Sequence, residues 1–408
     1  ALRALGAMAW AVAPRTPAGS PIAAFTQTVT IPPNTSVTVA FDAQAFPQLV
    51  VPSPALWWPW QLGEAALHAL SINVTLHDTG VALDQVVASF GIRTANASLD
   101  GNGNLLFRVN GVPMLIRGAG WAPDLLLRTN SSSGGGPEYV ASELAYVRDM
   151  GLNAIRLEGK MDADVPLFAG LDAAGIMALP GWACCDAWQH WSDWTATQHA
   201  VSVASMRSQA RRLRIRPSVI GFFISSDELP PSDVEAAYRA ALAAEGWPNA
   251  VIAAASAGTS PISGPTGVKM SGPYSWVPEL YWLTDPGLLG GAFGFLTEGG
   301  PGENPLPHES LEAVVPPSWL WPPYPDDAWG HGGNPAGLLG TIARFIAPLA
   351  ARYGESGSLL ELLTKSQAAV LEGHRAMFEA YSLRKYVNAT GLIPVSYTHL
   401  TLPTNREV

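Results

Sequence analysis

The sequence predicts an α/β protein in which a (β/α)₈ barrel follows part of a β-sandwich. Beyond residue 100, short apolar runs bounded by Gly and Pro alternate with helical stretches, the pattern of buried parallel strands joined by helices. Two carboxylates, Asp227 and Glu298, each stand at the end of such a run. Because the C-terminal ends of barrel strands share one face, both side chains are expected to point into one pocket.

Residues 1–99 are expected to be all-β. Residues 25–41 alternate apolar and polar side chains on either side of Pro32-Pro33-Asn34, as the two strands of a hairpin do. Residues 70–76 alternate in the same way. These segments indicate part of a β-sandwich.

Residues 100–395 are expected to supply the eight strands that a barrel requires. The strands are expected at residues 113–118, 153–159, 175–182, 219–227, 251–256, 269–274, 292–298 and, more weakly, 391–395. Helices are expected at residues 138–150, 165–174, 200–213, 232–245 and 359–386. A doubly wound sheet would need a Gly-rich phosphate loop after its first strand, and Gly118-Ala119-Gly120-Trp121 does not have that pattern.

Residues 396–408 break this pattern, because they are polar and carry no apolar run. They are expected to be a non-native tail joined to a fragment, and a divergent native end is the alternative. Strand eight would then be incomplete, and strand one, near residues 114–118, would be left as an unpaired edge. On this view the 408-residue chain is expected to be poorly soluble and nearly inactive.

Composition excludes several classes of protein. With 48% hydrophobic and 14% charged residues, the chain is folded and can bury a large core. A net charge of −10 without a Lys/Arg cluster argues against nucleic acid as a partner. The sequence contains no run of 18 apolar residues, so it predicts no membrane span. Sequons favour the secretory route; they begin at Asn34, Asn73, Asn96, Asn130 and Asn388.

The cysteine and histidine residues predict neither a metal nor a cofactor. Cys184 and Cys185 are adjacent and are the only cysteines, so they cannot supply a disulfide framework or, by themselves, a zinc site. They are expected to be free, buried thiols at a strand end beside the pocket. His308 and His331 lack metal-ligand spacing.

Short motifs follow one another along residues 55–395. They are Leu56-Trp57-Trp58-Pro59-Trp60, Ser89-Phe90-Gly91-Ile92-Arg93, Phe107-Arg108-Val109-Asn110-Gly111, Arg156-Leu157-Glu158-Gly159-Lys160, Gly181-Trp182-Ala183-Cys184-Cys185-Asp186, Ser226-Asp227, Lys269-Met270-Ser271-Gly272-Pro273-Tyr274 and Phe295-Leu296-Thr297-Glu298. In this order they resemble glycoside hydrolase family 2. The motifs around Glu158 and Asp186 resemble its exo-β-D-glucosaminidase branch rather than the β-mannosidases or β-galactosidases. The resemblance implies that residues 1–99 are part of an immunoglobulin-like sandwich.

The resemblance also implies a reaction and its two carboxylates. Such enzymes remove terminal β-1,4-linked D-glucosamine from chitosan oligosaccharides by retaining double displacement, without a cofactor. Their acid/base ends strand four and their nucleophile ends strand seven, which here are Asp227 and Glu298. Glu228 is the alternative acid, because most of the larger family has Asn-Glu at this place. Strand alternation lets only one of the two neighbours face the lumen, and the Ser226-Asp227 pattern of the branch favours Asp227.

The remaining site residues are expected to bind the sugar. Ser226 and the carboxylate of Glu158 could hold a 2-ammonium group through charge-assisted contacts, and an ion pair of Glu158 with Arg156 or Lys160 is the structural alternative. Asp186 is assigned to substrate binding by the resemblance. Sugar rings could stack on aromatic side chains at strand ends, and core packing is the alternative for each; these are Trp182, Tyr274, Tyr281 and Trp282.

Two rival functions stay open at this point. One is a β-mannosidase-like family 2 hydrolase that reads a 2-hydroxyl group. The other is a non-catalytic carbohydrate-binding relative, against which the presence of both Asp227 and Glu298 argues.

Overall fold

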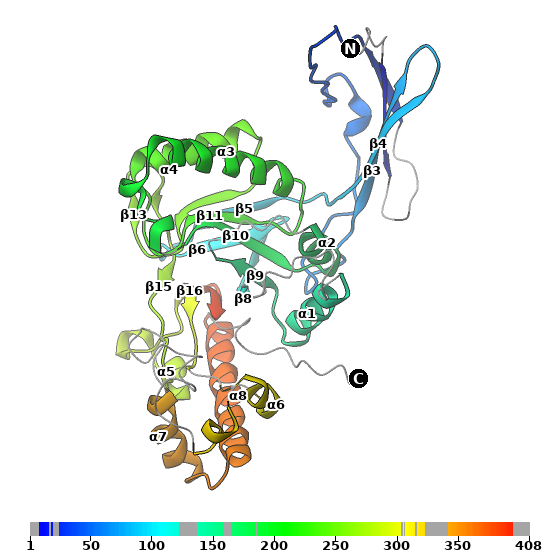
Figure 1. The fold of residues 1–408 in the computed structure, drawn as a ribbon. Helices are drawn as coiled ribbons and strands as arrows, with labels where there is room; N and C mark the ends of the chain where they lie inside the picture. The colour runs from blue at the N-terminus through cyan, green and yellow to red at the C-terminus, as the bar shows by residue number, and fades with distance from the viewer. Residues whose placement is uncertain are drawn as a thin grey trace.

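The computed structural model describes residues 8–15, 18, 24–121, 137–158, 165–184, 186–302, 305, 307–314, 316–322 and 342–394. These residues form two parts. An antiparallel sheet at the N-terminal end stands away from a larger body, in which helices surround a parallel sheet (Figure 1). No helix among the described residues combines the length and the apolar character needed to cross a bilayer.

The N-terminal sheet has four strands in the order β2-β1-β3-β4, and every neighbouring pair is antiparallel. They are β1 (Met8–Arg15), β2 (Phe25–Val29), β3 (His68–Leu76) and β4 (Ala82–Phe90), with the short helix η1 (Pro47–Leu49) between β2 and β3. Strand β3 confirms the strand predicted at residues 70–76.

The hairpin predicted over residues 25–41 is wrong in its second half. Strand β2 pairs with β1, and residues 30–42 contain no strand. The ring centroids of Phe41 and Phe46 lie 5.7 Å and 4.6 Å from that of Phe25. The apolar residues of this segment therefore fold back into a local aromatic cluster, which competes with a strand ladder for the same side chains.

The larger body is the predicted barrel, with eight parallel strands in the order β12-β11-β10-β9-β8-β17-β16-β15. They are β8 (Ile116–Trp121), β9 (Ala154–Leu157), β10 (Met177–Ala183), β11 (Gly221–Ser225), β12 (Ala250–Ala254), β15 (Lys269–Met270), β16 (Gly294–Gly299) and β17 (Ala389–Pro394). Because β12 and β15 are the ends of this order, the hydrogen-bonded ladder is open between strands five and six. The two-stranded hairpin of β13 (Thr259–Ser260) and β14 (Gly264–Pro265) occupies that stretch of sequence.

Helices follow most barrel strands, as the sequence predicts. The predicted helices are α1 (Pro137–Asp149), α2 (Val165–Ala174), α3 (Ala196–Leu213), α4 (Ser232–Ala244) and the long α8 (Leu359–Leu383). Shorter ones are α5 (Glu279–Leu283), α6 (His308–Val314), α7 (Ile342–Tyr353), η2 (Asp186–Trp188), η3 (Trp191–Asp193), η4 (Pro286–Leu288) and η5 (Pro317–Trp319). Helices α5, α6 and α7 gather around α8 on one side of the sheet (Figure 1).

Strand eight corrects the expectation of an unpaired strand one. Strand β17 pairs with β16 on one side and with β8 on the other, and all six of its residues are buried. Leu392 and Ile393 supply the apolar side chains, and Pro394 is the last residue, where a missing amide donor is tolerated. The reason to expect an aggregating, inactive chain is thereby removed. Residues 396–408 lie outside the described residues, so the non-native tail stays a prediction.

A three-stranded antiparallel sheet fills one end of the barrel. It consists of β5 (Ala95–Leu99), β6 (Leu105–Val109) and β7 (Val112–Met114). The predicted domain boundary after residue 99 falls inside the β5–β6 hairpin, so residues 95–99 belong to the barrel. Phe107 is 1% exposed, and its ring centroid lies 5.9 Å from that of Phe295. Because Phe295 is near the start of β16, this sheet covers the end opposite to the C-terminal strand ends.

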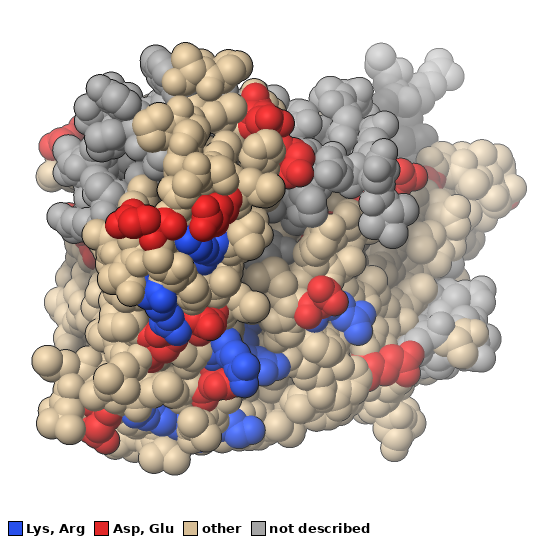
Figure 2. All heavy atoms as spheres, turned by 90° about the horizontal axis from the view of Figure 1, so that it is seen from below, with Lys and Arg blue, Asp and Glu red and all other residues tan. Residues whose placement is uncertain are grey.

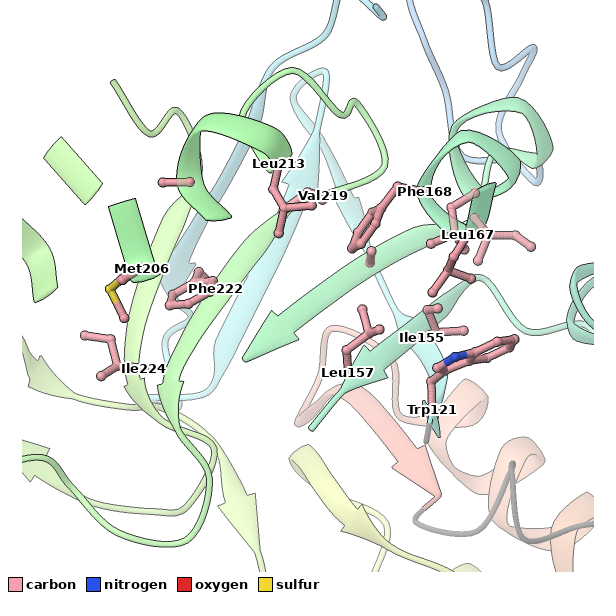
Figure 3. Close-up of a cluster of buried hydrophobic side chains, with 14 of the residues drawn as sticks. Trp121, Ile155, Leu157, Leu167, Phe168, Met206, Leu213, Val219, Phe222 and Ile224 are labelled. Atoms are coloured by element: carbon pink, nitrogen blue, oxygen red, sulfur yellow. The ribbon is translucent and has the colours of Figure 1, made fainter. Parts of the chain in front are cut away.

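A second core lies between the barrel strands and their helices (Figure 3). Ile155 and Leu157 of β9 point outward into it, together with Phe222 and Ile224 of β11. Alternation along β9 therefore turns the residue between them, Arg156, towards the barrel interior. On the side of α8, Met377 and Tyr381 pack against strands β16 and β17 in the same manner.

Most basic side chains on the surface visible in Figure 2 lie beside acidic ones. On the face seen from below, basic side chains lie next to acidic ones, and no continuous basic area is visible (Figure 2). Arg352 of α7 contacts Glu279 of α5 at 2.5 Å and Glu372 of α8 at 2.7 Å. These contacts tie the three helices together. Because these side chains are in contact with solvent, each ion pair contributes only about 0–1 kcal/mol.

Replacing Phe107 by Ala should destabilise the barrel, because it empties the space between β6 and the barrel strands. We expect a loss of about 3–5 kcal/mol in the free energy of unfolding, measured by denaturant titration. Val87→Ala on the 67% exposed side chain of β4 is the matched control and should change little. Similar losses for both variants would contradict this role for Phe107.

Candidate active site

Four polar side chains meet at the C-terminal ends of three barrel strands. Arg156 lies on β9 and Glu158 directly follows it, Ser226 directly follows β11, and Glu298 lies near the end of β16. Parallel strands bring these ends together although the residues are up to 142 positions apart in the chain. The sequence predicted three of the four as site residues.

Arg156 connects the other three. Its Nη1 donates to Glu298 Oε1 at 2.7 Å and to the carbonyl oxygen of Thr297 at 3.2 Å. Its Nη2 donates to Ser226 Oγ at 2.7 Å and lies 3.4 Å from Glu158 Oε1. The side chain is 3% exposed, so the guanidinium is held in an environment of low dielectric where these contacts are strong. Sequence reasoning treated Arg156 only as an alternative partner for Glu158.

Ser226 links the two carboxylates. Its hydroxyl donates to Glu158 Oε1 at 2.7 Å, and its oxygen lies 3.5 Å from Glu298 Oε1. Because Arg156 donates to the same hydroxyl oxygen, the O–H of Ser226 is free to point at Glu158.

The two glutamates differ in their ionisation. Burial raises the pKa of Glu298 to about 7, against the opposing charge of Arg156, and the neighbouring Glu158 adds to the rise. Burial also raises the pKa of Glu158, but the charge of Arg156 and the hydrogen bonds from Glu298, Ser226 and Arg156 outweigh it and leave the pKa below its usual value. The side chain of Glu158 is 30% exposed and that of Glu298 10%. The site therefore holds one ionised carboxylate and one that titrates near neutral pH.

Tyr274 completes the surroundings of Glu298. It follows β15, and its hydroxyl donates to Glu298 Oε2 at 3.1 Å. Burial and the nearby carboxylates of Glu298, Asp227 and Glu158 raise the pKa of Tyr274, so the phenol stays a neutral donor. Tyr274 thus lies in the predicted site, in contact with a carboxylate.

Asp227 lies at the exposed side of the same strand ends. Its Oδ2 accepts a hydrogen bond of 3.0 Å from Nε2 of Gln189, a residue that sequence reasoning missed. The backbone N–H of Glu228 donates to Gln189 Oε1, also at 3.0 Å. Gln189 therefore contacts the carboxylate of Asp227, whereas in Glu228 it contacts only the backbone N–H.

The aromatic residues predicted to bind sugar separate into two groups. Trp182 lies near the end of β10 and is half-buried, and its Nε1 has no hydrogen-bond partner among the described residues. Trp282 is 0% exposed and packs against Tyr381 of α8, so its assignment to substrate binding is wrong. Tyr281 lies edge-on to Trp282 at 5.0 Å and belongs to the same cluster under α5. Tyr281 and Trp282 both lie on α5, and they pack in the interior because α5 buries one face against α8.

Two further predictions concern the segment after β10. Cys184 is disulfide-bonded, so the expectation of free thiols is wrong. Its sulfur lies 3.3 Å from Glu158 Oε1, beside the site as expected. Asp186 is the first residue of η2, and its side chain lies outside the described residues. Among the described residues, no group of three or more His, Cys, Asp and Glu side chains is arranged to hold a metal ion.

Comparison with known proteins gives the family. Residues 15–93 match the model of the glycosyl hydrolases family 2. The chain is 39% identical over 370 residues to an exo-β-D-glucosaminidase of Streptomyces avermitilis, and the match covers 88% of this chain and 39% of that protein. An exo-β-D-glucosaminidase of Amycolatopsis orientalis is 35% identical over 389 residues, covering 92% and 36%. The chain thus spans about two fifths of the length of these relatives.

Solved structures agree with this fold. The Amycolatopsis orientalis exo-chitosanase superposes with a TM-score of 0.78 at 33% identity, covering 95% of this chain and 45% of that one. A single-substitution variant of the same enzyme has been solved in complex with PNP-β-D-glucosamine. A β-D-mannosidase from Dictyoglomus thermophilum has a TM-score of 0.76 at 17% identity, covering 97% of this chain and 48% of that one, and shows the shared fold.

The raised pKa of Glu298 predicts how stability depends on pH. Between the usual value of 4.5 and about 7, the carboxyl of the unfolded chain releases its proton while folded Glu298 keeps it. The contribution to stability is therefore full below pH 4.5 and is lost as pH rises through 7. Relative to Glu298→Gln, which does not titrate, the wild-type protein should lose up to about 3 kcal/mol over this interval, measured by denaturant unfolding at several pH values.

Glu228→Gln is the matched control for this experiment, because it removes an exposed carboxyl that follows a different strand, β11. Its stability should follow the wild-type pH curve. A Glu298→Gln curve parallel to that of the wild type would show that burial does not raise the pKa of Glu298.

Proposed function

Because this chain belongs to glycoside hydrolase family 2, we propose that it supplies the catalytic site of a retaining exo-glycosidase that removes terminal β-1,4-linked D-glucosamine from chitosan oligosaccharides. The observation that carries the proposal is the contact of Ser226 with Glu158 beside Glu298. It puts a partly exposed, ionised carboxylate next to the carboxylate that would attack the sugar. The names of the relatives, exo-β-D-glucosaminidase and exo-chitosanase, support the same substrate class.

Glu298 is the proposed nucleophile. Its Oε1 is engaged by Arg156 and its Oε2 by Tyr274, so two donors hold the carboxyl in one orientation. A nucleophile must be ionised, and with a pKa of about 7 Glu298 is only partly so at neutral pH. A bound ammonium group beside Glu158 would add a positive charge close to Glu298 and favour its ionised form. Binding of the correct substrate thus prepares the nucleophile.

Asp227 is the proposed acid/base. In the first step Glu298 forms a bond to the anomeric carbon while the glycosidic C–O bond breaks, and Asp227 gives its proton to the departing oxygen. In the second step Asp227 takes a proton from water, whose oxygen attacks the anomeric carbon and releases Glu298. Its exposed position at the strand end suits a group that must meet both the departing sugar and solvent water.

Glu158 and Ser226 are proposed to recognise the 2-ammonium group. An ammonium group has only donors, so it needs acceptors, and Glu158 supplies an ionised one whose remaining exposure leaves room for a ligand. The hydroxyl of Ser226 already points at this carboxylate and fixes its position. Removing the carboxylate of Glu158 would leave the ammonium group of the substrate without its ionic partner.

Glu298→Ala should abolish hydrolysis of nitrophenyl β-glucosaminide by the purified protein, because no group remains to form the glycosyl intermediate. Azide should partly restore turnover and yield a product of inverted configuration, which NMR of the product would identify. Activity within about tenfold of the wild type would exclude Glu298 as the nucleophile.

Asp227→Ala should slow substrates with poor leaving groups by roughly 10²–10⁴-fold, whereas activated aryl glycosides should be affected far less in the glycosylation step. Pre-steady-state release of the aryl group measures that step. Glu228→Ala is the matched control at the neighbouring position and should show no such selectivity. The opposite result, with selectivity only in Glu228→Ala, would assign the acid to Glu228.

Glu158→Gln should weaken turnover of glucosaminides by roughly 1–3 kcal/mol in transition-state free energy, the size of a lost charged hydrogen bond. Comparing kcat/KM on nitrophenyl β-glucosaminide and nitrophenyl β-mannoside measures this effect and also tests the β-mannosidase alternative. The mannoside should be affected much less. Equal losses on both sugars would mean that Glu158 serves only to hold Arg156 and Ser226.

A further inference from the structure

Gln189 is a buried amide in an otherwise exposed stretch of chain. It lies between η2 and η3, and its side chain is 5% exposed, whereas Trp188 before it and His190 after it are exposed. A buried polar side chain in such a turn is stable only if its hydrogen-bonding groups have partners. Both partners of Gln189 lie in the segment that follows β11.

The orientation of the Gln189 amide is fixed by chemistry. The backbone N–H of Glu228 can only donate, so the atom that faces it at 3.0 Å must be the acceptor Oε1. This leaves Nε2 as the atom 3.0 Å from Asp227 Oδ2. Gln189 therefore donates to the carboxyl of Asp227 and accepts from the next peptide group, and flipping the amide would break both bonds.

The carbonyl group of Glu228 is held as well. The hydroxyl of Ser225 donates to the carbonyl oxygen of Glu228, and the same hydroxyl lies 3.1 Å from the carbonyl oxygen of Ala253 on β12. Gln189 and Ser225 together fix the course of the chain just after β11. In that course the side chain of Asp227, and not that of Glu228, meets the amide of Gln189.

We propose that Gln189 is a positioning residue for Asp227, which assigns the transferable proton to Oδ1 by donating its own N–H to Oδ2; the proposal rests on the proposed function. A proton on Oδ2 would face the N–H of Gln189, so the protonated acid carries it on Oδ1. When the Oδ1–H bond breaks and the proton passes to the departing glycosidic oxygen, negative charge develops on the carboxylate. The bond from Gln189 then becomes charge-assisted and stronger.

Two variants separate the parts of this role. Gln189→Glu keeps the shape and the acceptor for the N–H of Glu228 but puts a carboxyl oxygen in place of the amide donor to Asp227, and Gln189→Met loses both groups. With glucosamine disaccharide, whose departing oxygen needs a proton, we expect kcat to fall by roughly 10- to 100-fold in both variants, the effect of one charged hydrogen bond. Aryl release from a dinitrophenyl β-glucosaminide should change by less than about threefold, and KM should stay close to that of the wild type.

Gln209→Met on α3 is the matched control, since it makes the same exchange away from the site, and melting temperatures of all variants report on folding. An equal loss of kcat on both substrates, or no loss on the disaccharide, would overturn the proposal. A crystal structure of Gln189→Met gives a test without turnover, in which Asp227 should leave its wild-type orientation. An unmoved Asp227 carboxyl would overturn the role of Gln189, whatever sugar the protein acts on. A wild-type protein that is inactive on glucosaminides would refute only the proposed function.

Discussion

The guanidinium of Arg156 is buried at the centre of the site and donates to side chains from three different strand ends. An unpaired charge in such a place would cost several kcal/mol, so the position of every neighbouring group is coupled to it. Its bond to Glu298 holds that carboxyl in place, and its bond to the oxygen of Ser226 leaves the serine O–H directed at Glu158. Arg156 faces both carboxylates. Its charge helps to keep Glu158 ionised, whereas burial favours the protonated form of Glu298.

The barrel makes this arrangement possible. Alternation along β9 sends Ile155 and Leu157 outward into the core beneath the helices, and Arg156 must therefore enter the lumen. At the other end, Phe107 and its neighbours on β6 fill the interior, which confines polar groups to the C-terminal strand ends. Closure of the sheet by β17 between β16 and β8 holds Glu298 at a fixed distance from the first two strands. Packing on one side and pairing on the other thus determine where the charges lie.

The two carboxylates are held by different means. Glu298 is buried and receives hydrogen bonds from Arg156 and Tyr274, whereas Asp227 is exposed and receives one from the neutral amide of Gln189. Two groups with the same chemistry are thereby given different environments, which is what assigns different tasks to paired carboxylates in an active site. The segment after β10 contributes to both, through Cys184 beside Glu158 and through Gln189.

Hydrophobic periodicity, which is a local property, predicted the barrel and its strand ends, and contiguous motifs predicted Glu158, Ser226, Asp227 and Glu298 as site residues. It contained a usable signal for Arg156, a charged residue inside an apolar strand, which must be paired if it is buried. Other features depend on packing between segments that are distant in sequence. Trp282 lies in the core because α5 packs on α8. Strand eight pairs with strand one, although its apolar run is short. Gln189 reaches Asp227 across 38 positions of sequence, and no local pattern specifies such a contact, since a hydrogen bond between distant segments depends on where the whole sheet brings them.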